Sequence, residues 1–166
     1  MDKLIITDNP QQTTGIELFQ IYVAMTKEQL LKIAKKLDLW VSPNYTKQKT
    51  AERLSDEVLE NPMEVVTRLA KAELQLLDEI VQAGPDKGVT RKSRKSYYML
   101  QKLGLVVTYD DVPAGTWTMF MPDEVRKSLA ALYKPFLDMA LQGVKRPSAK
   151  DIRFMGFMNN LFGSQE

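Results

Sequence analysis

The sequence contains neither cysteine nor histidine. Without cysteine, the chain forms no disulfide and offers no thiolate nucleophile or thiolate metal ligand. Without histidine, it also lacks the commonest general base and the commonest metal ligand. A hydrolase triad, a zinc site and a histidine phosphotransfer site are therefore excluded, and an enzyme would have to rely on Asp, Glu, Lys, Ser or Tyr.

Long apolar runs and cofactor motifs are missing as well. No uninterrupted apolar run approaches the ~20 residues that a membrane-spanning helix needs, and the run in MDKLIITDNPQQ is too short for a secretory signal. Tyr98-x-x-x-Lys102 matches the spacing of short-chain dehydrogenases, but no glycine-rich cofactor loop accompanies it. We expect a cytoplasmic, bacterial or phage-like protein that has no enzymatic activity, cofactor, metal, membrane attachment or small-molecule substrate.

The overall composition is that of an ordinary globular protein. Apolar residues make up 44% of the 166 residues and charged residues 27%, which argues against wholesale disorder. The formal net charge of +2 is too small to indicate a polyanionic partner by itself. The positions of the charges therefore matter more than their sum.

Periodicity and turn signals predict a mainly α-helical chain with one small β-hairpin. A helix is favoured over a strand for 16–25, and a capping box of Thr26 with Gln29 predicts a helix over 26–37. Pro122 and Ser148 are suited to begin later helices. Further helices are expected over 46–60, 63–83 with a break near Ala70, 90–103, 122–132, 135–143 and 149–163, and strands over 105–109 and 116–121.

The strongest functional signal is the basic segment between Lys87 and Lys102, which contains no acidic residue. If it forms a helix from Thr90 to Leu103, part of its cationic side can contact phosphates while Arg and Ser reach base edges. Asp110 and Asp111, expected at the tip of the following hairpin, would repel the same phosphates. The candidate nucleic-acid contacts in this segment are Arg91, Lys92, Arg94, Lys95, Tyr98 and Lys102.

The expected order from 63 to 133, namely helix, helix, basic helix, hairpin and helix, resembles that of winged helix-turn-helix domains. That resemblance implies that the basic helix docks on duplex DNA, and operator-binding members of this class usually dimerise. The resemblance is one of element order rather than of a fixed motif.

The preceding stretch, TKEQLLKIAKKLDLWVSPNYTKQKTAERLSDEVL, resembles the helix–extended loop–helix of SAP-type and Rho N-terminal modules. In those modules the loop and the start of the second helix face nucleic acid, which here implies Lys47 and Lys49. The sequence departs from the pattern in one respect, because Asn44-Tyr45 stands where a glycine is usual.

Aromatic and C-terminal apolar residues suggest further roles. The alternation of Trp117 with Met119 and Met121 favours a core position, whereas Trp40 lies in a loop and could be buried or exposed as a stacking platform. The last helix is apolar on more than one face, so it must cover its own domain or a partner. Its candidate partner-binding residues are Phe154, Phe157 and Leu161.

These patterns divide the chain into an N-terminal segment of uncertain structure (1–25), a helix–extended loop–helix (26–62), a winged helix (63–133) and C-terminal helices (134–166). The first hypothesis is a non-enzymatic nucleic-acid-binding protein, with DNA favoured over RNA, acting as a transcriptional regulator or accessory factor. The alternative is a protein-interaction or assembly module that pairs with a protein partner or a second copy through the C-terminal helices.

Overall fold

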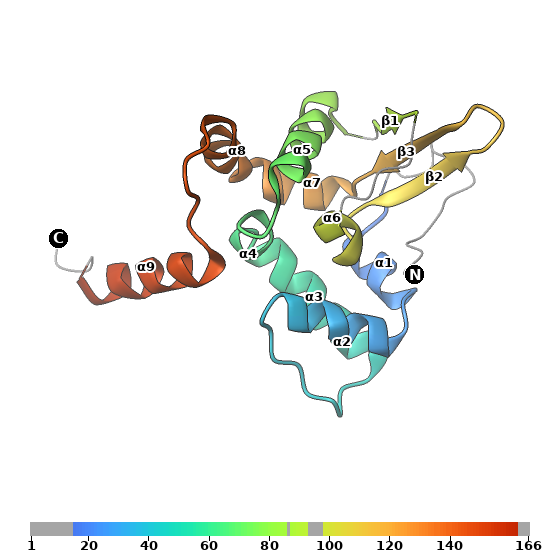
Figure 1. Ribbon diagram of the computed structural model, residues 1–166. Helices are drawn as coiled ribbons and strands as arrows, with labels where there is room; N and C mark the ends of the chain where they lie inside the picture. Colours follow the sequence, from blue (N-terminus) through green and yellow to red (C-terminus); the bar gives the residue numbers. More distant parts are fainter. Residues whose placement is uncertain (1–14, 86, 93–97, 163–166) are drawn as a thin grey trace.

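The computed structural model describes residues 15–85, 87–92 and 98–162, with the backbone alone given for Tyr98 and for 156–162. A small sheet lies beside α5 and α7, with α8 on the far side of α5, while α1, α2 and α3 lie below (Figure 1). The last helix, α9, projects to one side of this body. The predicted class, mainly α with a small β component, is confirmed.

The elements follow one another as α-helices interrupted by a short stretch of sheet. Their bounds are α1 Leu18–Val23, α2 Lys27–Lys36, α3 Lys47–Glu60, α4 Met63–Val66, α5 Lys71–Ala83, β1 Val89–Arg91, α6 Tyr98–Lys102, β2 Val107–Asp111, β3 Thr116–Phe120, α7 Asp123–Ala130, α8 Tyr133–Gln142 and α9 Ala149–Phe162.

The helix ends follow the local chemistry of the sequence. The Thr26 hydroxyl accepts from the Gln29 amide at 3.1 Å, and the Gln29 side chain accepts from the Thr26 amide at 2.9 Å. Ser148 and Asp151 form the same reciprocal pair at the start of α9. Such caps satisfy amide groups that have no partner inside the helix. The predicted break at Ala70 is also confirmed, since Ala70 is the N-cap of α5.

The sheet corrects the prediction of a helix from Thr90 to Leu103. Val89–Arg91 forms strand β1 and pairs antiparallel with β3, so the strand order is β1-β3-β2. Helix α6 comprises Tyr98–Lys102, and 93–97 lie outside the described residues. In this register Val89 faces Met119 and is buried, and the hydroxyls of Thr90 and Thr118 lie 2.8 Å apart. Burial of Val89 and pairing to β3 thus outweigh the helical spacing of the charges.

Gly88 permits this strand to approach the sheet closely. A Cβ atom added at this position would lie 2.4 Å from the Thr118 side chain and 2.6 Å from the Phe120 ring. Only glycine fits such a gap without displacing its neighbours.

The hairpin is present and its second strand begins at Thr116 as predicted, but its first strand is shifted by two residues, to Val107–Asp111. Asp110 and Asp111 belong to β2, opposite Trp117 and Thr116, and the turn comprises residues 112–115. The expectation that these two carboxylates form the tip is therefore wrong. Asp111 instead supports the turn, because its Oδ1 accepts from the Ala114 amide at 3.2 Å.

The core is continuous from α1 to α8. It joins the buried leucines and valines of the helix–loop–helix to those around the sheet, and Trp117 is part of it with 2% of its surface exposed. Polar contacts between distant elements accompany the packing. The Leu18 amide at the start of α1 donates to Glu124 at the start of α7, and Ser128 Oγ donates to the Leu59 carbonyl.

The short helix α6 is held at both ends by hydrogen bonds to other helices. The Glu73 carboxylate of α5 is buried and accepts from the Leu100 amide in the first turn of α6 at 2.8 Å. The Tyr22 hydroxyl of α1 donates to the Leu103 carbonyl just after α6 at 2.7 Å. Burial raises the pKa of Tyr22 well above its usual range, so its hydroxyl stays protonated as this bond requires.

Replacing Glu73 by alanine should lower the free energy of unfolding by about 1–3 kcal/mol, because the buried Leu100 amide would lose its acceptor. The change is measured as a shift of the urea midpoint at pH 7. Glu52→Ala, an exposed glutamate on α3, is the matched control and should change stability by less than ~0.5 kcal/mol. Equal effects of the two substitutions would contradict the capping role of Glu73.

Candidate nucleic-acid interface

Helix α2 separates its apolar and cationic residues onto opposite sides. Leu30, Ile33 and Ala34 are buried against the rest of the protein. Lys32 and Lys35 are exposed on the other side. This arrangement follows from the 3.6-residue period of the helix, which brings residues three and four apart onto one face.

The loop between α2 and α3 returns along the outer side of α2. Val41 is buried and its neighbour Trp40 has 76% of its surface exposed, as expected where an extended chain alternates its side chains. The loop is tied to the start of α2, because Lys27 Nζ donates to the Pro43 carbonyl at 2.6 Å. The uncertainty over Trp40 is thereby resolved, and this tryptophan is exposed.

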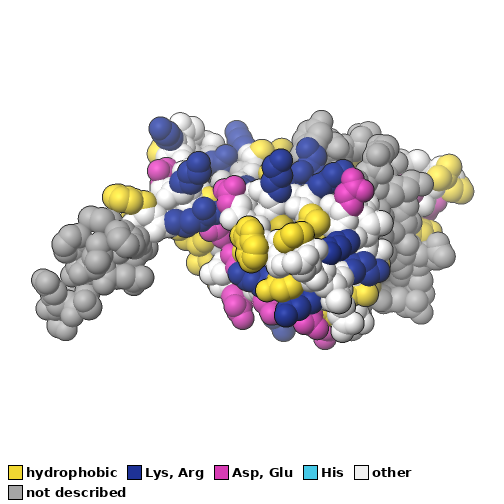
Figure 2. All heavy atoms as spheres, turned by 90° about the horizontal axis from the view of Figure 1, so that it is seen from below, with side chains coloured by type: hydrophobic (Ala, Val, Ile, Leu, Met, Phe, Trp, Pro, Cys, Tyr) yellow, Lys and Arg dark blue, Asp and Glu magenta, His cyan; other side chains and the backbone are white. Residues whose placement is uncertain are grey.

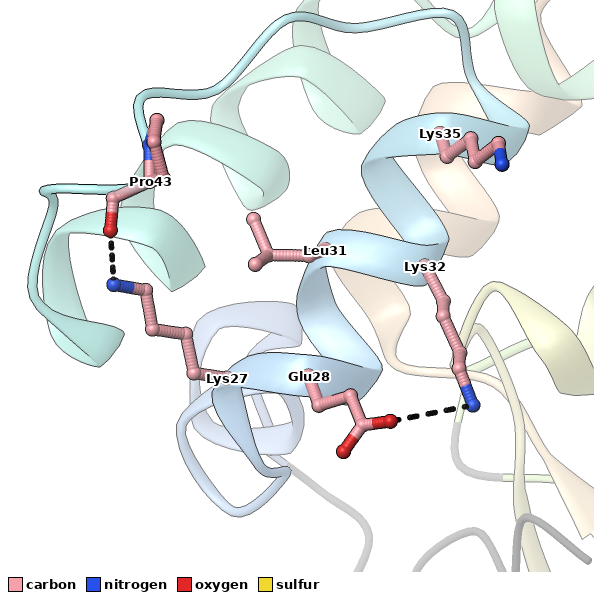
Figure 3. A pocket seen from close by; sticks show the side chains of 6 residues that line it. All are labelled: Lys27, Glu28, Leu31, Lys32, Lys35 and Pro43. Atoms are coloured by element: carbon pink, nitrogen blue, oxygen red, sulfur yellow. Dashed lines mark hydrogen bonds and ion pairs between the residues drawn. The ribbon is translucent and has the colours of Figure 1, made fainter.

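A shallow depression of about 500 Å³ lies between α2 and this loop. In Figure 3, Leu31 and Lys27 extend from α2 towards the loop, whereas Lys32 and Lys35 extend from the other side of the helix. The lining combines two apolar residues with three lysines and one glutamate. The lining residues are Lys27, Glu28, Leu31, Lys32, Lys35 and Pro43.

The start of α3 adds two further lysines beside the loop. Thr46 caps α3, accepting from the Lys49 amide at 3.1 Å. Lys47 and Lys49 are both exposed, and Lys49 Nζ lies 4.5 Å from the centre of the Tyr45 ring. We call the surface formed by Lys27, Lys32, Lys35, Lys47 and Lys49 with Leu31, Trp40 and Pro43 the lysine face.

Positive charge dominates this part of the chain. Residues 26–50 contain six lysines and two carboxylates, Glu28 and Asp38. Glu28 pairs with Lys32 at 3.9 Å, and Asp38 pairs with Arg68 at 3.0 Å. Figure 2, a view from below Figure 1, shows hydrophobic side chains in the middle of the molecule with lysine and arginine side chains, and some acidic ones, around them.

An ion-pair network keeps the Asp38 carboxylate compensated at the edge of the lysine face. Arg68 contacts both Asp38 and Glu64, and Arg153 of α9 donates to both oxygens of Glu64 at 2.6 and 2.7 Å. The hydrogen bond from Arg153, and a further one from Arg68, lower the pKa of Glu64 against the opposing effect of partial burial. The network also attaches α9 to α4.

The structure does not gather the predicted basic-helix residues on one helix. Arg91 lies on β1 and forms an ion pair with Glu79 of α5. Lys92 is exposed after the strand, and Lys102 is exposed in the last turn of α6. Tyr98 begins α6, and Arg94 and Lys95 lie outside the described residues.

The C-terminal candidates lie on α9. Phe154 is 63% exposed, and the neighbouring Met155 is 56% exposed. Phe157 and Leu161 belong to the same helix, but their side chains lie outside the described part of the structure.

The described residues offer no metal cluster or membrane-spanning helix. Within that part of the chain, no group of three or more carboxylates is arranged to hold a metal ion. Helices long and apolar enough to cross a membrane are likewise not found among the described residues. Comparison with protein-family models, with curated proteins and with solved structures finds no match to the chain.

Sequence reasoning assigned Lys47 and Lys49 to a binding surface but did not assign Lys27, Lys32, Lys35 or Trp40. The lysines of α2 were visible as the polar side of a capped amphipathic helix. The lysines of α2 and α3 are connected through the loop between the two helices, and this loop is bonded to α2 where Lys27 donates to the Pro43 carbonyl. That contact spans 16 residues and leaves no local pattern.

The Glu64 network should make stability depend on acid pH. Because the folded-state pKa of Glu64 is lowered, its contribution is present above the unfolded value of about 4.3 and is lost as pH falls through the folded value. Glu64→Gln should cost on the order of 1 kcal/mol at pH 7 and flatten the fall in stability between about pH 5 and 3.

Urea unfolding at a series of pH values measures this effect, and Glu60→Gln, at an exposed position, is the control. If the pH dependence of Glu64→Gln matched that of the unchanged protein, the network would not be a source of acid sensitivity.

Proposed function

We propose that the protein binds nucleic acid without catalysing a reaction, and that the lysine face is its principal contact. The observation that carries the proposal is the concentration of cations around the depression between α2 and its loop, where the two nearby carboxylates are already paired. The resemblance of 26–62 to SAP-type and Rho N-terminal modules supports the same surface, because it implies Lys47 and Lys49.

A polyanion is the partner that suits this surface best. Each lysine that meets a phosphate releases a condensed counterion, so several such contacts provide affinity that falls steeply with salt. Lys35 and Lys47 are exposed, and neither forms an ion pair within the described part of the chain. Their ammonium groups are therefore available without breaking an internal contact.

The proposal keeps a winged helix over 63–133, but as a secondary nucleic-acid contact and not as the principal one. The order α5, β1, α6, β2, β3 and the sheet order β1-β3-β2 support a winged-helix arrangement of 63–133. The original hypothesis required Arg91 to face DNA from a helix, whereas Arg91 is on a strand and paired with Glu79. Lys92 and Lys102, with Arg94 and Lys95, are therefore a secondary contact in this proposal.

Neutralising Lys35 and Lys47 together (K35Q/K47Q) should weaken nucleic-acid binding about 10-fold near 0.1 M salt, because two phosphate contacts are lost. The log-log dependence on salt should also become shallower by about 2. Fluorescence anisotropy with labelled mixed-sequence oligonucleotides, single- and double-stranded, measures both quantities at several salt concentrations.

The control is K71Q/K150Q, which removes the same charge from two exposed lysines on α5 and α9. It should leave affinity within about 2-fold of the unchanged protein. Equal losses in the two double variants would indicate a net-charge effect and would overturn the assignment to the lysine face. Undetectable binding of the unchanged protein at low salt would overturn the proposed function itself.

A second candidate function, assembly with another protein chain, is favoured by the apolar surface near the C-terminus. Of six large hydrophobic residues exposed in the described part of the chain, four lie between 141 and 155: Leu141, Val144, Phe154 and Met155. Phe154 and Met155 lie on the projecting helix α9, Leu141 lies on α8 and Val144 follows α8, and exposed apolar groups on a projecting helix are typical of interaction surfaces. The occupant that we propose is a second copy of α9 from another protomer.

Sedimentation velocity over a range of protein concentrations tests this assembly. The unchanged protein should show a monomer–dimer equilibrium, and Phe154→Ser should shift it towards monomer about 10-fold in concentration by loss of apolar burial. Val112→Ser, at another exposed apolar position in the hairpin turn, is the control. A protein that stays monomeric at all concentrations would remove the candidate.

A further inference from the structure

Trp40 is held in an exposed position by its neighbours in the loop. The Val41 side chain is buried in the core and Leu39 packs partly against it, so the side chain between them turns outwards. The Leu39 amide donates to the Ala34 carbonyl at 2.9 Å, which fixes the chain where it leaves α2. The indole is therefore presented to solvent by a segment that is anchored on both sides.

The two tryptophans of the chain differ sharply in environment. Trp117 lies in the core at 2% exposure, whereas Trp40 remains 76% exposed. An indole is large and mostly apolar, so leaving it in water forgoes a substantial gain from burial. The side chain of Trp40 is mostly outside the core, and two cationic residues of the last turn of α2, Lys35 and Lys36, precede it by a few positions in the chain.

We propose that the lysine face binds single-stranded nucleic acid, with an unpaired base stacked on Trp40 and the adjoining phosphates held by the lysines. This inference rests on the proposed function and deepens it by naming the class of nucleic acid. In a duplex the faces of the bases are covered by their neighbours, so an exposed aromatic plane finds a partner only on an unpaired base.

The depression beside the loop suits the same ligand. Leu31 and Pro43 provide apolar contact for a sugar or base, Lys27 lies beside them, and Lys32 and Lys35 extend from the other side of α2. A single strand bound along this surface would thus find apolar groups for its bases and cations for its phosphates.

Anisotropy titrations of the full chain with labelled 20-nucleotide oligothymidylate and a 20-base-pair mixed-sequence duplex test the proposal. At equal salt, oligothymidylate should bind more tightly than the duplex. Trp40→Ala should weaken oligothymidylate binding about 10-fold and duplex binding by less than about 2-fold. Trp40→Phe, which keeps a smaller aromatic plane, should stay within about 3-fold of the unchanged protein. Substituting an exposed loop residue leaves the core intact.

Intrinsic fluorescence provides a second readout that a general loss of charge contacts would not alter. Stacking of thymine on Trp40 should quench the emission of the unchanged protein, while Trp117 remains shielded in the core. In Trp40→Phe the emission comes from Trp117 alone and should not respond to oligothymidylate. A persisting response would overturn the assignment of the stacking partner.

The outcomes separate the inference from the proposed function. Equal affinity for single strand and duplex, unaffected by Trp40→Ala, would overturn the inference and leave the proposed function standing. No binding to either oligonucleotide at low salt would overturn both. Displacement of oligothymidylate by 20-residue polyglutamate at equal concentration would also overturn the inference, because it would indicate an acidic-protein surface. Oligouridylate in place of oligothymidylate distinguishes RNA from DNA, and preference for either sugar supports the proposal.

Discussion

The buried hydrogen bond from the Leu100 amide to the Glu73 carboxylate connects helix α6 to helix α5. Glu73 belongs to α5, which packs on α8, and its second oxygen accepts from the Ala70 amide at the start of α5. One carboxylate therefore caps two helices. The Tyr22 hydroxyl of α1 donates to the Leu103 carbonyl at the other end, so α6 is held between α1 and α5, and β2 follows it in the chain. A helix of five residues has little stability of its own, so these contacts substitute for length.

The lysine face is a consequence of the way α2 is buried. Leucine, isoleucine and alanine on one side of the helix pack inwards, and the same helical period places the lysines outside. A polar face of this kind becomes a candidate interface only when other elements add to it. Here the loop contributes Pro43 and Trp40, α3 contributes Lys47 and Lys49, and the Arg68 and Arg153 guanidinium groups compensate the Asp38 carboxylate at its edge.

The segment between Lys87 and Lys102 shows why a run of like charges predicts an interface poorly. Positive charge is compatible with strand, loop or helix, and the choice among them is made by apolar and backbone contacts. Val89 is buried opposite Met119 of β3, and Gly88 permits the two strands to approach closely. Thr90 and Arg91 therefore pair with β3 as a strand. Arg91 forms an ion pair with Glu79, a residue twelve positions away on α5, so its charge has a partner within the protein.

Local chemistry in the sequence determined the helix caps at Thr26, Thr46 and Ser148, the break at Ala70, the hairpin, and the burial of Trp117. Each depends on residues within a few positions of one another, or on strand alternation that is visible along the chain. Tertiary structure decided that Val89–Arg91 is a strand, that Trp40 is exposed, and that the loop before α3 is bonded to the start of α2. These outcomes depend on contacts between residues far apart in sequence, and short-range periodicity carries no information about which distant partner a residue will meet.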